Sequence, residues 1–74
     1  MLSACILIKA VPTKMDAILK VLKEILNVKK AYFTYGRFDL VAFFEAVDYK
    51  AVRAVTVKIN SLEGVRSTET LVEA

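Results

Sequence analysis

Two short stretches of this chain carry groups that could bind a small charged molecule. Gly36 permits a tight or positive-φ turn with exposed backbone N–H groups, and Asp39 follows it with a carboxylate suited to an ammonium group. Near the C-terminus, hydroxyl groups gather at Ser67, Thr68 and Thr70, where they could bind a carboxylate. Each stretch also has a plainer explanation, because an aspartate often caps a turn and threonine favours strands. Neither stretch alone identifies a site.

The composition argues against catalysis and against the common metal sites. The 74 residues include no histidine and one cysteine, Cys5, which removes the usual general base and the common structural zinc sites. The eight acidic residues fall at expected caps, turns and strand ends instead of in pairs suited to acid–base work. Cys5 lies among apolar neighbours, where we expect a buried, unreactive thiol. We therefore expect a protein that is not an enzyme and uses no metal or cofactor.

Direct contact with nucleic acid is not expected either. The net charge of +3 comes from scattered lysines and the Lys29-Lys30 pair, which is typical of a solvated surface. The RNA-recognition fold needs a second aromatic residue two positions after the first, but Leu40 stands there when Phe38 is taken as the first. The chain also offers no room for a helix-turn-helix.

The apolar stretches are too short to span a membrane. Uninterrupted apolar runs reach only from Ala4 to Ile8 and from Leu40 to Phe44, far below the ~20 residues that a spanning helix needs. No basic segment precedes the first run, so a signal peptide is not expected. These features predict a cytoplasmic protein.

Hydrophobic periodicity predicts the element order β-α-β-β-α-β. Alternating or continuous apolar runs with β-branched residues indicate strands, and apolar residues three and four positions apart indicate helices. The expected elements are a strand over Leu2 to Ala10, a helix capped by Thr13 and reaching Leu26, a strand over Val28 to Tyr35, a Gly36 to Phe38 turn, a strand over Asp39 to Ala46, a helix capped by Asp48 and ended by Glu63-Gly64, and a strand over Val65 to Val72.

The third predicted strand is apolar on both faces. Leu40, Ala42 and Phe44 point to one side, whereas Val41 and Phe43 point to the other. Two helices can cover only one face, so a second copy is expected to cover the other. The predicted fold class is α+β: residues 1–74 form a single ferredoxin-like domain with a four-stranded antiparallel sheet, helices on one face, and a dimer on the other as in a dimeric α+β barrel.

Several motifs together resemble a known family. Gly36-Arg37-Phe38-Asp39 follows a strand, Pro12 precedes the first helix, and Val65-Arg66-Ser67-Thr68-Glu69-Thr70 lies near the C-terminus. This combination resembles the effector-binding domain, or RAM domain, of the leucine-responsive regulatory protein/AsnC (Lrp/AsnC) family, over essentially all of the sequence. Full-length members carry an N-terminal helix-turn-helix that is missing here, so the expectation is a stand-alone effector domain.

The resemblance implies an assembly and a ligand. Dimers would join into rings, commonly octamers or decamers, with amino-acid ligands between the dimers. The residues carried over by motif are Tyr35, Gly36 and Arg37 as pocket lining, Asp39 as the holder of the α-amino group, and Ser67, Thr68 and Thr70 as contacts to polar groups of the neighbouring dimer. A zwitterion needs an anion at one end and neutral donors at the other, in a site dried by assembly.

The leading hypothesis is an oligomeric amino-acid sensor that regulates transcription indirectly, with full-length Lrp/AsnC regulators as expected partners. Two alternatives stay open. One is a small dimeric α+β barrel enzyme of the monooxygenase or isomerase type, and the other is an oligomerisation domain without a ligand.

Overall fold

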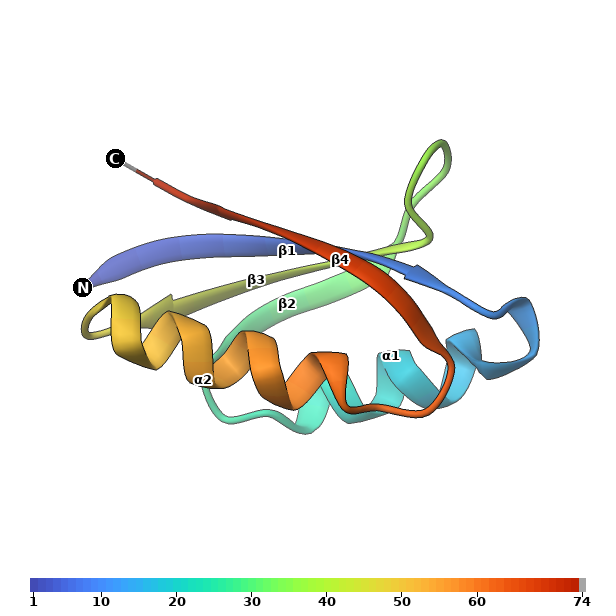
Figure 1. The fold of residues 1–74 in the computed structure, drawn as a ribbon, viewed down its shortest axis with the longest axis horizontal. Coiled ribbons are helices and arrows are strands. Elements are labelled where there is room, and N and C mark those ends of the chain that lie inside the picture. Colours follow the sequence, from blue (N-terminus) through green and yellow to red (C-terminus); the bar gives the residue numbers. More distant parts are fainter. Residues whose placement is uncertain (74) are drawn as a thin grey trace.

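The chain folds in the predicted order β-α-β-β-α-β (Figure 1). A computed structural model describes residues 1–73. The strands are β1 Leu2–Ala10, β2 Val28–Phe33, β3 Leu40–Ala46 and β4 Val65–Val72, the helices are α1 Met15–Glu24 and α2 Tyr49–Asn60, and a 3-10 turn, η1 Pro12–Lys14, precedes α1. The predicted bounds of the first and last strands are confirmed.

The four strands form one antiparallel sheet in the order β2-β3-β1-β4. Both helices lie on one face of this sheet, and the opposite face has no helix over it (Figure 1). The ferredoxin-like prediction is therefore confirmed. The central strands β1 and β3 pair from Leu2 opposite Ala46 to Ile8 opposite Leu40.

The core lies between the sheet and the two helices. Leu40, Ala42 and Phe44 are all buried in it, as their alternation predicted, whereas Val41 and Phe43 lie on the helix-free side. The largest fully buried side chains come from both layers and are Ile6, Ile8, Leu22, Leu40, Phe44 and Ile59. This packing fixes the register of the sheet, because a shift by one residue would turn the apolar set of a strand to the wrong face.

The two helix starts differ from each other. Asp48 caps α2 as predicted, because its Oδ1 accepts a hydrogen bond from the Ala51 N–H at 2.9 Å. The prediction that Thr13 caps α1 is wrong. Pro12 opens a 3-10 turn in which Lys14 N donates to Val11 O at 2.9 Å, so Thr13 lies inside the turn and Lys14 takes the cap position without a side-chain cap bond.

Both helices also end earlier than predicted. The helix α1 stops at Glu24, and Leu26, expected on its apolar stripe, is 93% exposed. The helix α2 ends at Asn60, and a loop then leads to β4.

Gly64 in this last loop contacts the start of α1. Its φ is +94°, its carbonyl accepts from the Val11 N–H at 2.8 Å, and an added Cβ would lie 2.5 Å from Lys14 Cβ. Beside it, Lys14 Nζ lies 2.9 Å from Glu63 Oε1, and this hydrogen bond and charge lower the pKa of Glu63. The position therefore requires glycine for its backbone angle and for space.

The substitution Gly64→Ala should lower the free energy of unfolding by about 2 kcal/mol or more, because left-handed backbone costs a non-glycine residue roughly 1–2 kcal/mol and the new methyl must displace the Lys14 stem. Urea unfolding at a fixed protein concentration measures this change in the free energy of unfolding. Gly36→Ala is the matched control, since Gly36 has φ +118° with nothing within 4 Å of its Cβ position. Equal losses in the two variants would contradict the role of the close approach.

Candidate functional site

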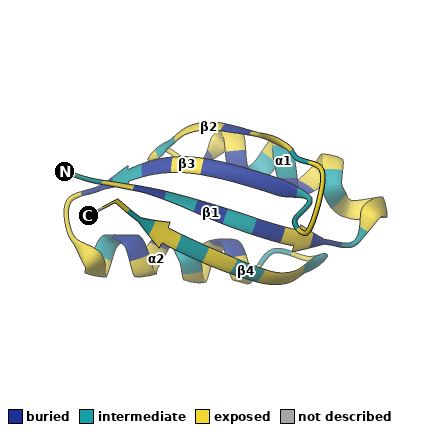
Figure 2. Cartoon of the chain, turned by 90° about the horizontal axis from the view of Figure 1, so that it is seen from above, coloured by how far each residue is buried: buried dark blue, intermediate teal, exposed yellow. Residues whose placement is uncertain are grey.

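The sheet face without helices carries a band of apolar side chains, and we call it the helix-free face. Figure 2 views the sheet from this side, with the helices beneath it. In the register of β1, Leu7 lies opposite Val41 and Glu69, and Cys5 lies opposite Phe43 and Leu71. The apolar members of the face are Cys5, Leu7, Tyr32, Val41, Phe43 and Leu71.

This band is partly exposed in the single chain. Tyr32, Phe43 and Leu71 are 44%, 36% and 50% exposed. The rings of Tyr32 and Phe43 pack with centroids 6.0 Å apart, and Lys30 Nζ lies 5.9 Å from the centre of the Phe43 ring. Cys5, expected to be buried, is only half-buried, because the strand alternation turns it to this face. Contiguous apolar surface of this kind marks an interaction site.

A loop of residues 34–39 connects β2 to β3 and rises from the sheet on the helix-free side (Figure 1). Gly36 turns the loop with a φ of +118°, and Tyr35 next to it is fully exposed. The base of the loop is closed by Thr34, whose Oγ1 donates to Phe38 O at 2.9 Å and whose N–H donates to Asp39 O at 2.9 Å. The turn predicted from Gly36 is thus present on a fixed base.

Asp39 ties this loop to the end of β1. Its N–H donates to Ile8 O at 2.8 Å, and its Oδ2 accepts from the Ala10 N–H at 2.9 Å. The residue is half-buried, and within residues 1–73 no group donates a hydrogen bond to its other oxygen, Oδ1. Asp39 therefore has a structural role and also keeps a carboxylate oxygen available for a ligand.

Lys9 stands beside the loop, and sequence reasoning missed it. Its Nζ donates to Arg37 O at 3.4 Å, and in the sheet it lies opposite Ser67. The structure thus brings together Lys9, Arg37, Asp39 and Ser67 at one end of the sheet. The alternation of β1 was the available signal, because it places Lys9 on the same face as Cys5 and Leu7.

Thr68 and Thr70 lie on the other side of β4 from Ser67. Thr68 Oγ1 donates to Asn60 Oδ1 at 3.0 Å, and the Thr70 and Thr56 hydroxyls are 3.2 Å apart. Both threonines face α2, so the hydroxyl cluster seen in the sequence is divided between the two faces of the sheet. Their contribution to a ligand site stays a prediction.

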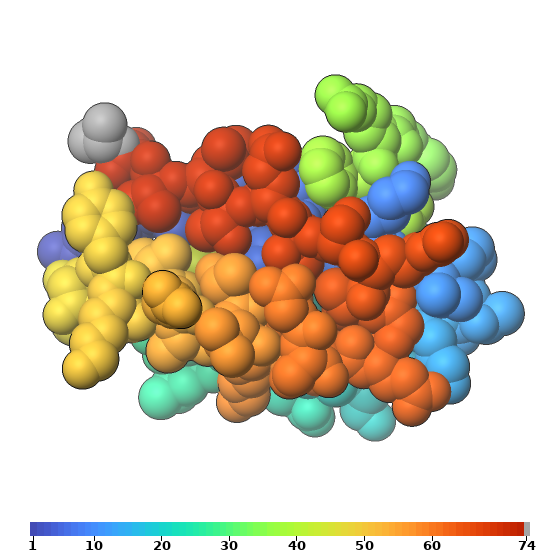
Figure 3. Space-filling model, in the orientation of Figure 1, coloured from blue at the N-terminus to red at the C-terminus, as the bar shows by residue number. Residues whose placement is uncertain are grey.

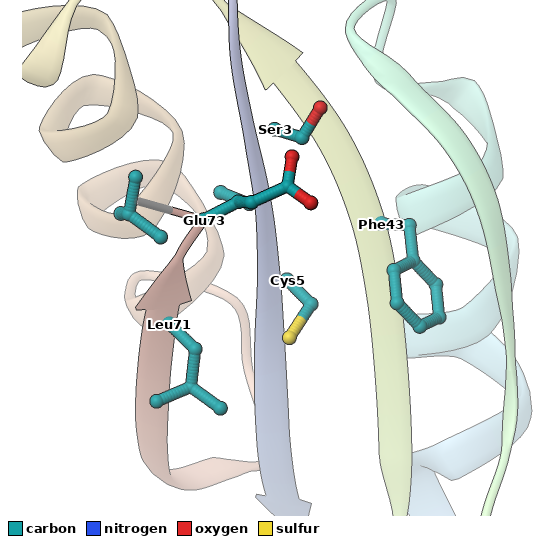
Figure 4. A pocket seen from close by; sticks show the side chains of 7 residues that line it. Ser3, Cys5, Phe43, Leu71 and Glu73 are labelled. Carbon is teal, nitrogen blue, oxygen red and sulfur yellow. The ribbon is translucent and has the colours of Figure 1, made fainter.

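A hollow of about 290 Å³ lies at the opposite end of the helix-free face from the loop. It is lined by side chains from β1, β3 and the end of β4, and Glu73 reaches from the end of β4 over β1 towards Ser3 (Figure 4). Its labelled lining residues are Ser3, Cys5, Phe43, Leu71 and Glu73. No pattern along the sequence indicated it, because the hollow forms only when β1 pairs with both neighbours.

Two negative observations apply to the described part of the chain. None of its helices has the length and apolar character needed to cross a membrane. No group of three or more cysteine, aspartate or glutamate side chains in residues 1–73 is placed to hold a metal ion.

Solved structures include close matches to this fold. TTHA0845 from Thermus thermophilus matches with a TM-score of 0.96 and 33% sequence identity, over 100% of this chain and 94% of that one. AsnC of E. coli matches with a TM-score of 0.90 and 24% sequence identity. A feast or famine regulatory protein of M. tuberculosis, complexed with L-methionine, matches with a TM-score of 0.84 and 23% sequence identity. These two likenesses show the fold; the matches cover 97% and 99% of this chain but only 50% of each regulator.

Sequence comparison gives the family. No curated protein sequence matches the chain. The family model for the Lrp/AsnC ligand binding domain matches residues 3–73, nearly the whole sequence. The chain therefore belongs to the Lrp/AsnC ligand-binding domain family.

Proposed function

We propose that this chain is an amino-acid-binding sensor module in the transcriptional regulation of amino-acid metabolism. Membership of the Lrp/AsnC ligand-binding domain family supports the regulatory role. The L-methionine complex of the structurally similar M. tuberculosis regulator supports an amino acid as the ligand. The module acts by binding and not by catalysis, and we place it in the cytoplasm, beside the DNA whose use it regulates.

The observation that carries this proposal is the available Oδ1 of Asp39 at the end of the sheet that also carries Lys9 and Ser67. A free amino acid presents an ammonium and a carboxylate group on adjacent atoms. The Asp39 carboxylate suits the ammonium group, and the Lys9 ammonium and Ser67 hydroxyl suit the carboxylate. Tyr35 and Arg37 are exposed and project from the same loop, where they can contact both the ligand and another copy.

Assembly completes the site in this proposal. Two copies pair through the helix-free face, and the dimers join into an octameric or decameric ring in which a neighbouring dimer dries the site around Gly36 and Asp39. Removal of water strengthens the polar contacts to a zwitterion. Thr68 and Thr70 belong to the proposed contacts with the neighbouring dimer. Longer Lrp/AsnC regulators carry the same type of domain and are proposed partners in mixed assemblies.

The substitution Asp39→Asn should weaken amino-acid binding about tenfold or more, because a hydrogen bond to a charged group contributes roughly 1.5–3 kcal/mol. It should leave the fold stable, since an amide oxygen can still accept from the Ala10 N–H. Calorimetric titration with a panel of free amino acids, together with thermal unfolding, checks both points.

Two further variants make this test specific. Asp39→Ala should also destabilise the fold by about 1–3 kcal/mol, because it leaves the Ala10 N–H without its acceptor. Asp16→Asn on the exposed side of α1 removes the same charge and should change neither property. An affinity that Asp39→Asn leaves intact would remove Asp39 from the ligand site, and a native chain that binds no amino acid would favour the ligand-free oligomerisation domain.

The substitution Phe43→Lys should weaken the dimer by a factor of about 100 or more, since an unpaired charge buried in an interface costs roughly 3–5 kcal/mol. Val41→Lys, on the same face, should act in the same direction. Sedimentation velocity at micromolar concentration measures the change. Val57→Lys is the control, because Val57 is 58% exposed on α2, away from the helix-free face. Dimers that persist in both variants would show that the sheets do not pair.

A further inference from the structure

The net positive charge of this chain resides in one helix. The chain has 11 basic and eight acidic residues. The helix α2 contains three of the basic residues, Lys50, Arg53 and Lys58, and no acidic residue, so the rest of the chain carries eight of each and is formally neutral. All three of these side chains are exposed. The lysines that look scattered along the sequence are therefore balanced by acidic residues everywhere except on α2.

The chain itself does not neutralise this charge. Neither of the two ion pairs that form within residues 1–73 involves α2. Asp48, the nearest acidic residue in the sequence, uses its Oδ1 to cap the helix. The neighbouring strand β4 presents the hydroxyls of Thr68 and Thr70 to α2 and turns Glu69 to the helix-free face. The three cations of α2 are thus available to an external partner.

The exposed face of α2 also has an apolar centre. Ala54 and Val57 lie along the middle of this face, and Lys50, Arg53 and Lys58 surround them. Val57 is 58% exposed. Figure 3 shows α2, in yellow-orange to orange, along the surface of the molecule beneath β4 in red. An apolar centre with a charged rim is the usual arrangement of a protein–protein interface.

We propose that the exposed face of α2 docks an acidic amphipathic helix of a partner protein. Aliphatic side chains of that helix pack on Ala54 and Val57, and its carboxylates pair with the surrounding cations. Lys50 and Lys58 are eight residues apart, or about 12 Å along α2, so the partner presents carboxylates over about two helical turns. This face lies on the other side of the sheet from the helix-free face, and the inference requires neither sheet pairing nor amino-acid binding.

The composition of this face favours a protein over a nucleic acid. Three cations on phosphates would give a slope of only about −2.7 in the logarithmic dependence of affinity on salt, which is a weak attraction at physiological ionic strength. A phosphate backbone also gains nothing from the exposed side chain of Val57. An acidic helix with aliphatic residues uses both the charges and the apolar centre. The small area of a single helix face predicts weak, transient binding.

A synthetic peptide tests this docking. The probe is an end-capped, alanine-based peptide of about 18 residues, long enough to form a helix, with leucines at helical spacing on one face and glutamates on both sides of them. Fluorescence anisotropy of the labelled peptide at low ionic strength measures binding to the native chain. Replacing every glutamate of the peptide by glutamine should weaken binding more than tenfold, because the charge pairs are lost.

Charge exchange locates the binding surface. Arg53→Glu should weaken binding of the glutamate peptide about tenfold, since an attraction becomes a repulsion. The variant Lys50→Glu/Arg53→Glu/Lys58→Glu should lose binding to this peptide and should instead bind a matched peptide with lysine at every glutamate position. Lys20→Glu and Lys23→Glu make the same charge change on the exposed side of α1 and should change the affinity less than about threefold. Thermal unfolding checks that each variant is folded.

The apolar centre is tested separately. Val57→Ser should weaken binding of the glutamate peptide about fivefold, because it removes an apolar contact without changing the charge. A duplex DNA of mixed sequence should bind more weakly than the peptide at the same ionic strength, and Val57→Ser should leave that binding unchanged.

The remaining outcomes overturn the inference. A glutamate peptide that does not bind the native chain, or that binds the α2 variants as tightly, shows that this face does not dock an acidic helix. Equal losses in the α1 controls would mean that only the overall charge attracts the peptide. Tighter binding of the duplex than of the peptide would assign the face to nucleic acid instead. The proposed function fails by a different measurement, because amino-acid titration and sedimentation report on the other side of the sheet.

Discussion

The constraint on which the structure depends is the apolar character of both faces of β3. Leu40, Ala42 and Phe44 pack under the two helices, and Val41 and Phe43 form the middle of the helix-free face. Charged side chains are absent from the middle of β3 itself, within residues 40–44, and appear only at its flanks. Any arrangement of this chain in water must therefore either leave this surface exposed or cover it. The loop of residues 34–39 rises from the edge of that surface, so the ligand site that we propose borders the surface through which we propose that two copies pair.

Much of the fold could be predicted because its signals are local. The strands β1 and β4 were placed correctly from β-branched and apolar runs, and Asp48 was identified as a cap because aspartate at a helix start accepts from the first turn. The error at Thr13 has a local cause as well. Two good starting residues, Pro12 and Thr13, stand side by side, and the sequence does not say that the proline will begin a 3-10 turn first.

The site was less predictable because it depends on pairing between distant strands. Gly36 and Asp39 were found from the turn that they make, but the bond from the Ala10 N–H to Asp39 joins the end of β1 to a loop that is distant in the sequence. The contribution of Lys9 needs the register of β1 against β4, and the separation of Ser67 from Thr68 and Thr70 needs the orientation of β4. Chain order shows which residues are close in sequence, and only the sheet shows which of them share a face.

The contact at Gly64 has a consequence for how this chain folds. It joins the loop before the last strand to the turn that follows the first strand, through the bond from the Val11 N–H to the Gly64 carbonyl. Almost the whole polypeptide must be synthesised and brought together before this bond can form, and β1 likewise pairs with β3 and β4 instead of with its nearest neighbour in the sequence. Such long-range closure slows the search for the native state, so a slow rate of folding is built into the topology.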